Sequence, residues 1–314
     1  MGEINNWISS GSFFGVRTAK LAVYGVFGAV VGLFVHWLMV PFPWWFFLVY
    51  LGVVGVLMLN NFEPPLEWIF YQAKQAGYDG VQLVLTNRII GALEVDPEYI
   101  EKMAWKDYGL MISYHQPWDI KDFFCQFLIN LGIAPEIAKV PAAIFLALGC
   151  SKRGKIGQVV IHSNQMAAIT DELKSGAMVE MVDDSDFNFT DGGLVFDVGY
   201  ALMPNYRADW EKGFVGLTVD QVKERWTAWW NKWGRWCRQI HFYDILPGAK
   251  LKTKNRLPGT GMLPLSDLKS IMMASGQLTP GRLDIVLELN PLQIWWNSAT
   301  KLRQAIKLSN QYFR

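Results

Sequence analysis

The chain has 314 residues, which is enough for one large or two ordinary domains. Hydrophobic residues make up 51% of it and the formal net charge is +1, so its overall composition is close to that of ordinary globular proteins. Its three cysteines are too few and too far apart to form a disulfide framework or a cysteine metal pair, and both classes are excluded.

Two apolar runs near the start predict a transmembrane hairpin over residues 21–59, after a tail of residues 1–20. The first run, 21–40, is twenty residues long without a formal charge, which is the length that crosses a hydrocarbon layer. The second run, 44–59, follows after a turn of only three residues. A secretory signal peptide is the alternative, but polar chain rather than a second apolar run should follow its core.

Charged and aromatic residues indicate how this predicted hairpin is oriented. Arg17 and Lys20 precede the first run and the turn is uncharged, so the positive-inside rule places both termini in the cytoplasm. Trp44 and Trp45 then lie at the opposite membrane interface, which tryptophan prefers. We therefore expect a multi-pass protein of the inner, cytoplasmic membrane.

Glycines in both apolar runs predict where the hairpin helices pack. Without side chains, glycines allow two helices to approach closely in lipid. The favoured interpretation is that the hairpin packs on itself, and docking against the helix of a partner subunit is the alternative. The predicted helix-packing residues are Gly25, Gly28, Gly32, Gly52 and Gly55.

The rest of the chain predicts a mixed cytoplasmic part. Residues 60–150 are expected to be a mainly helical juxtamembrane region, including a short helix that ends at Gly77. Residues 151–290 are expected to be a mixed α/β domain, in which 282–289 alternate between apolar and charged residues like a half-buried strand. Residues 291–314 are expected to be a C-terminal amphipathic helix. The fold class is therefore predicted to be an α+β membrane protein with a cytoplasmic domain and interfacial helices.

A tryptophan-rich helix is predicted over residues 219–240, where Thr218 and Gln221 form a capping box at its start. On a helical wheel its tryptophans share one face, a pattern typical of helices that lie in the headgroup layer of a membrane. The C-terminal helix repeats the pattern more weakly. The alternative is that these rings face a protein core or a partner subunit. The predicted membrane-interface residues are Trp44, Trp45, Trp226, Trp229, Trp230, Trp233, Trp236, Trp295 and Trp296.

Charge is unevenly distributed along the chain. Residues 221–314 hold fifteen basic and five acidic residues, a net charge of +10, while the remainder carries −9. Anionic lipid headgroups are the favoured partner of the basic part, and single-stranded nucleic acid is a less favoured one. Docking of the basic part on the acidic middle of the chain is the third interpretation. The predicted contacts with an anionic partner are Arg225, Lys232, Lys250, Lys252, Lys254 and Arg256.

Motifs for catalysis or metal binding are incomplete. Residues 149–156 nearly match a phosphate-binding loop, but an isoleucine replaces the hydroxyl residue that binds magnesium, and Asp197 is only a weak candidate for its second carboxylate. His115, His162 and His241 are widely separated and lack a companion motif, so each is interpreted as a structural histidine. We therefore expect no catalytic residue, no metal and no other cofactor.

The predicted function is that of a non-catalytic, membrane-anchored subunit or scaffold of a larger complex for secretion, conjugation or transport. Its predicted partners are membrane lipids and other protein subunits. One alternative is an enzyme that acts on a lipid or lipid-linked substrate at the membrane interface. A second alternative is a membrane-tethered factor that handles nucleic acid. The chemical groups of the enzyme alternative would be Asp183, Asp184, Asp186 and Asp191.

Overall fold

The structure is a computed structural model, and in some helical stretches it describes the backbone alone. The described residues are 4–13, 16–38, 44–60, 63–116, 140–154, 156–163, 166, 169, 177–181, 193–202, 217–246, 255–277, 282–290 and 298–313.

Eight parallel strands form a closed barrel in which each strand pairs with its neighbours in sequence and β8 pairs with β1. The register places Trp7 of β1 beside Gly80 of β2, and Gly80 beside Met111 of β3. This is the architecture of the TIM-type β/α barrel. The strands are β1 (Ile4–Ser9), β2 (Gly80–Val84), β3 (Met111–His115), β4 (Val159–His162), β5 (Ala177–Glu180), β6 (Leu194–Asp197), β7 (Cys237–Phe242) and β8 (Leu283–Leu287).

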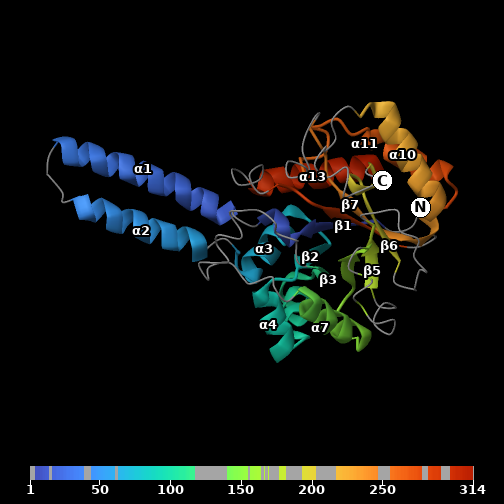
Figure 1. Ribbon diagram of the computed structural model, residues 1–314, viewed down its shortest axis with the longest axis horizontal. Coiled ribbons are helices and arrows are strands. Elements are labelled where there is room, and N and C mark those ends of the chain that lie inside the picture. The colour runs from blue at the N-terminus through green and yellow to red at the C-terminus, as the bar shows by residue number, and fades with distance from the viewer. Residues whose placement is uncertain are drawn as a thin grey trace.

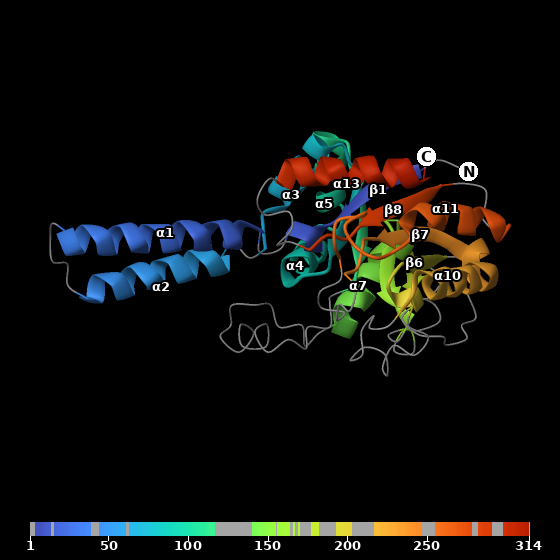
Figure 2. The same cartoon turned by 90° about the horizontal axis from the view of Figure 1, so that it is seen from above.

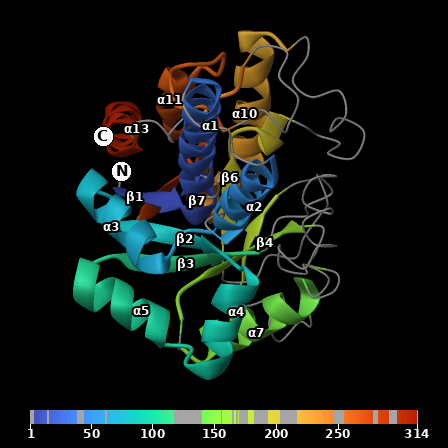
Figure 3. The ribbon, with the colours of Figure 1, turned by 90° about the vertical axis from the view of Figure 1, so that its left-hand side faces the viewer.

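Helices surround the strands, as the view in Figure 3 shows. Neighbouring helices contact one another around the barrel: α3 packs on α13, α13 on α11, α11 on α10, and α4 on α7. The helices of this ring are α3 (Leu66–Ala76), α4 (Asn87–Val95), α5 (Tyr99–Met103), η2 (Ala104–Tyr108), α7 (Val140–Lys152), α10 (Val219–Trp233), α11 (Leu265–Ala274) and α13 (Ser298–Phe313). Three short 3-10 turns are η1 (Ser10–Phe13), η5 (Tyr200–Leu202) and η6 (Gly234–Trp236).

The strand predicted at residues 282–289 is present as β8, but both of its faces are buried. Its apolar residues, such as Ile285, belong to the main core between strands and helices. Successive side chains of a strand point to opposite faces, so Asp284 and Glu288 lie on the inner face of the barrel. Asp284 and Glu288 therefore line the barrel interior, whereas Arg282, which precedes β8, remains exposed.

The predicted transmembrane hairpin is present as two antiparallel helices, α1 (Val16–Leu38) and α2 (Trp44–Asn60), inserted between β1 and α3. It projects from the barrel in Figures 1 and 2. Among the described residues, no helix combines the length and apolar character needed to cross a bilayer. On this finding the predicted transmembrane hairpin and the predicted inner-membrane localisation are wrong.

The predicted α+β membrane fold is wrong because the strands on both sides of residue 150 belong to one barrel. The boundary predicted between segments 60–150 and 151–290 falls inside that barrel, near the end of α7. Signals at the helix ends predicted the helix boundaries better than the segment boundaries predicted the fold. The helix predicted to end at Gly77 is α3, and Gly77 ends it with a positive φ of 94°.

The tryptophan-rich helix is shorter than predicted. The capping box of Thr218 and Gln221 is confirmed, but α10 ends at Trp233, and residues 237–242 form β7. Cys237 and Ile240, which the predicted helix included, are therefore strand residues. The alternation of the polar Gln239 and His241 with the apolar Ile240 and Phe242 is the strand signal that the helical interpretation overlooked.

Candidate metal centre

Ionisable side chains end six successive strands and meet at one end of the barrel. Because all strands are parallel, their carboxyl ends lie at the same end, which is where TIM-type barrels place their active sites. Side-chain alternation directs each of these residues inward, since the residues next to them along the strands belong to the outer core. The six are His115 of β3, His162 of β4, Glu180 of β5, Asp197 of β6, His241 of β7 and Glu288, which follows β8 directly.

Glu180 lies at the centre of this cluster and contacts all three histidines. Its Oε2 lies 2.9 Å from Nε2 of His115 and 3.2 Å from Nε2 of His162, and its Oε1 lies 3.4 Å from Nδ1 of His241. The same nitrogen of His241 lies 3.5 Å from Oε1 of Glu288. The side chains of Glu180 and His241 are 2% and 0% exposed, so these charges interact with little screening by water.

Burial and neighbouring charge act in opposite directions on the two central groups. Burial alone would raise the pKa of Glu180, but His241, His162 and His115 outweigh it and hold the pKa well below its usual range. Burial alone would lower the pKa of His241, but the carboxylates of Glu180 and Glu288 raise it to about 9. In the absence of a bound cation, the cluster therefore favours a carboxylate beside an imidazolium.

A backbone carbonyl determines the tautomer of His115. Nδ1 of His115 lies 2.8 Å from the carbonyl oxygen of Gln116, which only accepts hydrogen bonds, so Nδ1 carries a proton. The other ring nitrogen faces Glu180. The ring of His115 therefore bridges the carbonyl of Gln116 and the carboxylate of Glu180.

Hydrogen bonds fix the orientation of Asp197. Its Oδ1 accepts hydrogen bonds from the backbone amides of Gly199, at 2.8 Å, and Tyr200, at 2.7 Å. The hydroxyl of Tyr243 donates a third, at 2.6 Å. A Cβ atom on Gly199 would lie 2.4 Å from that hydroxyl, so only glycine leaves room for the tyrosine.

The cluster fits a divalent metal ion. Two sets of donor atoms, His115 with Glu180 and His241, and Asp197 with His241 and Glu288, each lie within 4.8 Å of one another. Atoms bound to one ion at about 2.0–2.2 Å must lie about this close together. Nε2 of His241 is buried without a hydrogen-bond partner among the described residues, and Nδ1 reaches the carboxylates of Glu180 and Glu288 only at 3.4 and 3.5 Å, which an ion would relieve. Buried carboxylates and imidazoles are also the ligands that Zn²⁺, Mn²⁺ and related ions accept.

The tryptophans predicted to face a membrane lie mainly against the barrel. Trp226, Trp230 and Trp233 are buried, and Trp229 and Trp236 are partly buried against the same core. The indole N–H of Trp226 donates to the carbonyl of Val198 at 3.0 Å. The lipid contact predicted for these rings is therefore wrong. Trp45 is 62% exposed on α2, the side chain of Trp44 is not described, and Trp295 and Trp296 lie outside the described residues.

The predicted helix-packing glycines divide into two groups. Gly25 and Gly28 face α2: a Cβ atom on Gly25 would meet Val54 and one on Gly28 would meet Tyr50, whose hydroxyl donates to the carbonyl of Gly25 at 3.0 Å. No atom lies near the Cβ positions of Gly52 and Gly55, and Gly32 is half-buried.

The predicted anion-contacting residues do not gather in one place. Arg225 donates to the backbone carbonyl of Leu202, and the ammonium of Lys232 lies 4.4 Å from the ring centroid of Trp233. Arg256 forms an antiparallel bridge with Asp244. Lys250, Lys252 and Lys254 lie outside the described residues, as do Asp183, Asp184, Asp186 and Asp191 of the alternative enzyme hypothesis.

The metal-centre residues were missed because they are far apart in sequence and match no compact motif. A repeated local signal was present, however: short branched runs that end in an ionisable residue, such as "VVIH", "AMVE" and "LVFD". Buried parallel strands are apolar along their length, so a polar residue at the end of several of them indicates a shared site. The three histidines, which the sequence alone did not connect, all contact Glu180 in this cluster.

Comparison with known proteins finds similar solved structures but no similar sequence. No family model matches the chain, and no curated protein matches its sequence. Among solved structures, D-allulose 3-epimerase from Methylomonas sp. is 11% identical with a TM-score of 0.49, covering 100% of this chain and 98% of that one. A 3-keto-D-glucoside 4-epimerase from E. coli is 14% identical with a TM-score of 0.43, over 76% of this chain and 94% of that one. The IOLI protein, with a binding zinc atom, is 12% identical with a TM-score of 0.44, over 79% and 94%.

The predicted non-catalytic scaffold is wrong, because it rested on a transmembrane hairpin and on tryptophans facing lipid. The described chain is instead a closed β/α barrel, no described helix can cross a bilayer, and the tryptophans of α10 lie against the core. The predicted partners, which were membrane lipids, subunits of a membrane complex and, less favoured, nucleic acid, are overturned with it. What the chain does must be argued from its own cluster of buried ionisable residues.

Proposed function

We propose that the chain is a divalent-metal-dependent enzyme that transfers protons on a small hydroxy-carbonyl compound, such as a sugar. The observation that supports this most is the convergence of six ionisable side chains at the carboxyl end of the barrel. Such a cluster is costly to bury without a ligand, and its position is where this fold carries catalysis.

Four side chains from adjacent strands would hold the ion: Glu180, Asp197, His241 and Glu288. They combine three carboxylates with one imidazole, and they lie on β5 to β8 without interruption. A bound divalent ion would polarise a carbonyl oxygen and so acidify the neighbouring C–H bond. The carbonyl and adjacent hydroxyl of a hydroxy-carbonyl compound offer two oxygen atoms suited to such an ion.

The remaining two histidines are suited to proton transfer. His115 and His162 both contact Glu180, and their rings meet edge to face at a centroid distance of 5.2 Å. The side chain of His162 is 12% exposed, against 3% for His115. His162 is therefore the group better placed to exchange a proton with a substrate that enters from solvent, and His115 lies deeper against the same carboxylate.

Metal content and solvent exchange test the proposal together. The purified chain is incubated with Mn²⁺, Co²⁺ or Zn²⁺ and its bound metal is measured by elemental analysis. D-Allulose, D-tagatose and D-xylose are then supplied in D₂O, and deuterium at the carbon next to the carbonyl is followed by NMR. We expect near-stoichiometric metal and metal-dependent exchange with at least one of these sugars.

Matched variants distinguish effects at the metal cluster from effects elsewhere on the barrel. Glu288→Gln and His241→Gln should lose most of the metal and the exchange, whereas Glu67→Gln, on the outer face of α3, should keep both. A chain that holds no divalent metal would refute the proposal. Full metal content without exchange into these or other hydroxy-carbonyl compounds would refute proton transfer as the reaction.

A further inference from the structure

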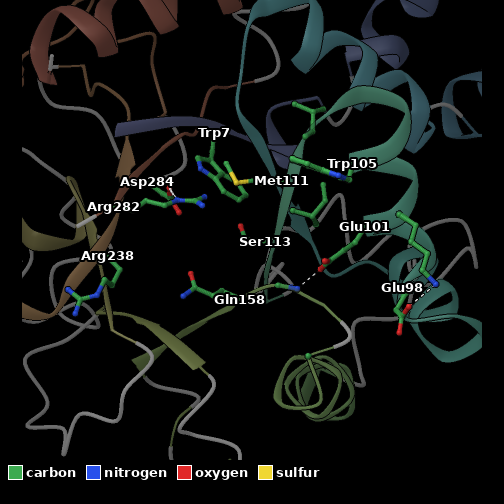
Figure 4. A pocket seen from close by; sticks show the side chains of 15 residues that line it. Trp7, Glu98, Glu101, Trp105, Met111, Ser113, Gln158, Arg238, Arg282 and Asp284 are labelled. Atoms are coloured by element: carbon green, nitrogen blue, oxygen red, sulfur yellow. Dashed lines mark hydrogen bonds and ion pairs between the residues drawn. The ribbon is translucent and has the colours of Figure 1, made fainter. Parts of the chain in front are cut away.

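A cavity lies at the end of the barrel opposite the candidate metal centre, where the strands begin. Its volume is about 670 Å³, within the range of small-molecule sites. Met111 and Asp284 border it from the first half of their strands, and Trp7 borders it from β1, beside Gly80 at the start of β2. Glu101 and Trp105 border it from α5 and η2 (Figure 4). No residue of the candidate metal centre is among its lining residues.

A distance along the strands and a buried pair of glutamines separate this cavity from the candidate metal centre. Asp284 and Glu288 are four residues apart on β8, which corresponds to roughly 13 Å along a strand. Between the two ends, the amide of Gln82 donates to that of Gln239 across the barrel at 3.1 Å, and both side chains are buried. The two ends of the barrel are therefore independent places for ligands.

The cavity has two walls of opposite net charge. On the strand side, Arg238 and Arg282 outnumber Asp284, and on the helix side, Glu98 and Glu101 outnumber Lys102. Each wall therefore has an excess of one charge, positive on the strands and negative on the helix. Figure 4 shows Arg282 and Glu101 on these facing walls.

On the strand wall, Arg282 and Ser113 offer hydrogen-bond donors to a ligand. Arg282 uses its Nε to bind Asp284 at 2.7 Å, and no hydrogen bond to its terminal amino groups occurs among the described residues. The hydroxyl of Ser113 is buried and also has no partner among them. Buried polar groups are normally satisfied, so the hydroxyl of Ser113 points to a missing partner. The guanidinium of Arg282, which is 42% exposed, is open to an acceptor such as a carboxylate on the same wall.

On the helix wall, Glu101 lacks a basic partner. Its carboxylate accepts the backbone N–H of Gly157, and no basic side chain pairs with it among the described residues, since Lys102 binds Glu98 at 2.7 Å. Burial raises the pKa of Glu101, which a neighbouring cation would reverse.

The backbone on this side is unusual. Trp105 lies in η2, a π-helical turn, and its side chain is 66% exposed at the cavity. Turns of this kind are rare and frequently occur at functional sites. An exposed indole at the edge of a cavity offers an apolar face to a ligand.

We infer that this cavity binds a small zwitterion with an apolar body, namely an α-amino acid with an apolar side chain. Its carboxylate would bind Arg282 and Ser113, and its ammonium would bind Glu101. The apolar side chain would lie among Trp105, Met111 and the neighbouring Leu110. Because the cavity is at the amino-terminal end of the barrel, such a ligand would act as an effector or a positioning ligand and not as the substrate.

Three probes that share one apolar body test the two charges separately by calorimetry. L-Phenylalanine carries both charges, 2-phenylethylamine carries the ammonium alone, and 3-phenylpropionate carries the carboxylate alone. We expect L-phenylalanine to bind at least about tenfold more tightly than either of the others. Equal binding of L-phenylalanine and one single-charge probe would overturn the inference, as would no binding of L-phenylalanine at millimolar concentration.

Variants of each wall should affect different probes. Glu101→Gln should weaken L-phenylalanine and 2-phenylethylamine by about tenfold and leave 3-phenylpropionate unchanged. The double variant Arg282→Gln with Asp284→Asn removes the ion pair without leaving a lone charge, and it should weaken L-phenylalanine and 3-phenylpropionate instead. Glu67→Gln is the control and should change none of the three.

Thermal unfolding of each variant, measured alongside, identifies a general loss of structure. If both walls can be neutralised in folded variants without weakening L-phenylalanine, the cavity is not its site. Metal content measured on Glu101→Gln should equal that of the unmodified chain, because the metal centre is at the other end of the barrel.

Discussion

Single side chains around the candidate metal centre have partners that orient them. Tyr243 positions Asp197, the carbonyl of Gln116 positions His115, and the amide of Asn255 donates to Oε2 of Glu288 at 3.3 Å. Groups that hold metal ligands in this way normally affect metal affinity even though they do not touch the ion. Their effect is therefore separable from that of the ligands.

Replacing Tyr243 by Phe should weaken metal binding while leaving the four proposed ligands in place. The variant loses the 2.6 Å hydrogen bond that fixes Asp197, and the loss of such a partner typically costs about 10–100-fold in metal affinity. Competition with a coloured chelator measures the affinity. Tyr71→Phe, at a residue that is 52% exposed on α3, is the control. Unchanged affinity in Tyr243→Phe would show that Asp197 is not a ligand.

His241 should make the stability of the metal-free protein depend on alkaline pH. Its pKa is raised from 6.5 to about 9, because Glu180 and Glu288 outweigh the effect of burial. A raised pKa stabilises the fold fully below the unfolded value of 6.5, and this contribution is lost as the pH rises through about 9. The loss is on the order of 3 kcal/mol.

Urea unfolding of the chelator-treated protein at pH 6 and pH 9.5 measures this loss. The free energy of unfolding should fall more in the unmodified chain than in His241→Gln, which carries no ionisable group at that position. Equal falls in the two proteins would contradict a raised pKa of His241.

Whole segments are held to the barrel by a few buried groups, and the segment that follows β7 is one example. Asp244 is fully buried, and its carboxylate accepts four backbone N–H groups, from Ile245, Gly259, Gly261 and Leu263, at 2.8–3.1 Å. A Cβ atom on Gly261 would lie 2.3 Å from the carbonyl oxygen of Ile245, so a residue with a side chain would not fit at this position. This carboxylate anchors the segment before α11.

Asp244→Ala should destabilise the protein strongly, and Asp267→Ala should not. The first change leaves several buried N–H groups without a partner, at about 1–3 kcal/mol each, so a total loss of more than about 3 kcal/mol is expected. The second removes only the ion pair with Lys223, in which both side chains are 41% exposed, and should cost less than about 1 kcal/mol. Chemical unfolding of both variants provides the comparison, and similar losses would contradict the anchoring role.

Helix α10 is held by the aromatic side chains on its inner face. Phe196 of β6 lies at the centre of this contact, with ring centroids 6.2 Å from Trp226, 4.6 Å from Trp229 and 5.3 Å from Trp230. Basic side chains lie over two further tryptophan rings. The ammonium of Lys232 lies 4.4 Å from the ring centroid of Trp233, and the guanidinium of Arg235 lies 3.7 Å from that of Trp236 in η6. The helix thus uses its tryptophans to cover the barrel.

Trp226→Ala should therefore cost about 3–5 kcal/mol, as expected when a large buried aromatic side chain is removed. Trp226 is fully buried and also donates its N–H to Val198. Trp45→Ala, at a residue 62% exposed on α2, should change stability by less than about 0.5 kcal/mol. Thermal or chemical unfolding distinguishes the two. A small effect at Trp226 would contradict the packing of α10 on the barrel.

Across the complete chain, the barrel and the hairpin differ in how they are stabilised. The barrel closes on itself through hydrogen bonds between all eight strands. The hairpin is joined at the carboxyl end of β1 and extends away from the barrel in Figures 1 and 2, with α1 and α2 in contact with each other. Large apolar side chains such as Tyr24, Phe27 and Leu48 are exposed on it.

Replacing residues 16–60 by a short Gly/Ser linker should leave the barrel folded. The metal centre and the core around the strands use none of these residues. We expect unchanged metal content and a far-UV circular dichroism spectrum that loses only helical signal. An unfolded or metal-free product would show that the hairpin is part of the barrel's stability.

Local features of this chain could be predicted from its sequence because they depend on neighbouring residues. The stop at Gly77 requires a left-handed conformation that glycine adopts easily, and the capping box requires only Thr218 and Gln221. The alternation of 282–289 identified a strand in the same way. Each of these signals is contained within a few consecutive residues.

Such local signals do not specify which part of the molecule packs against an apolar face. The tryptophans of α10 have the same helical spacing whether they meet lipid or protein, and only the closed barrel supplies Phe196 as their neighbour. Likewise His115, Glu180 and His241 lie up to 126 positions apart in sequence, and parallel strands bring them within 4.8 Å. The spacing of side chains along the chain determines which residues share a face of a helix or strand. The pairing of distant strands determines which residues that face contacts. Strand pairing joins residues far apart in sequence, so local sequence patterns do not reveal it.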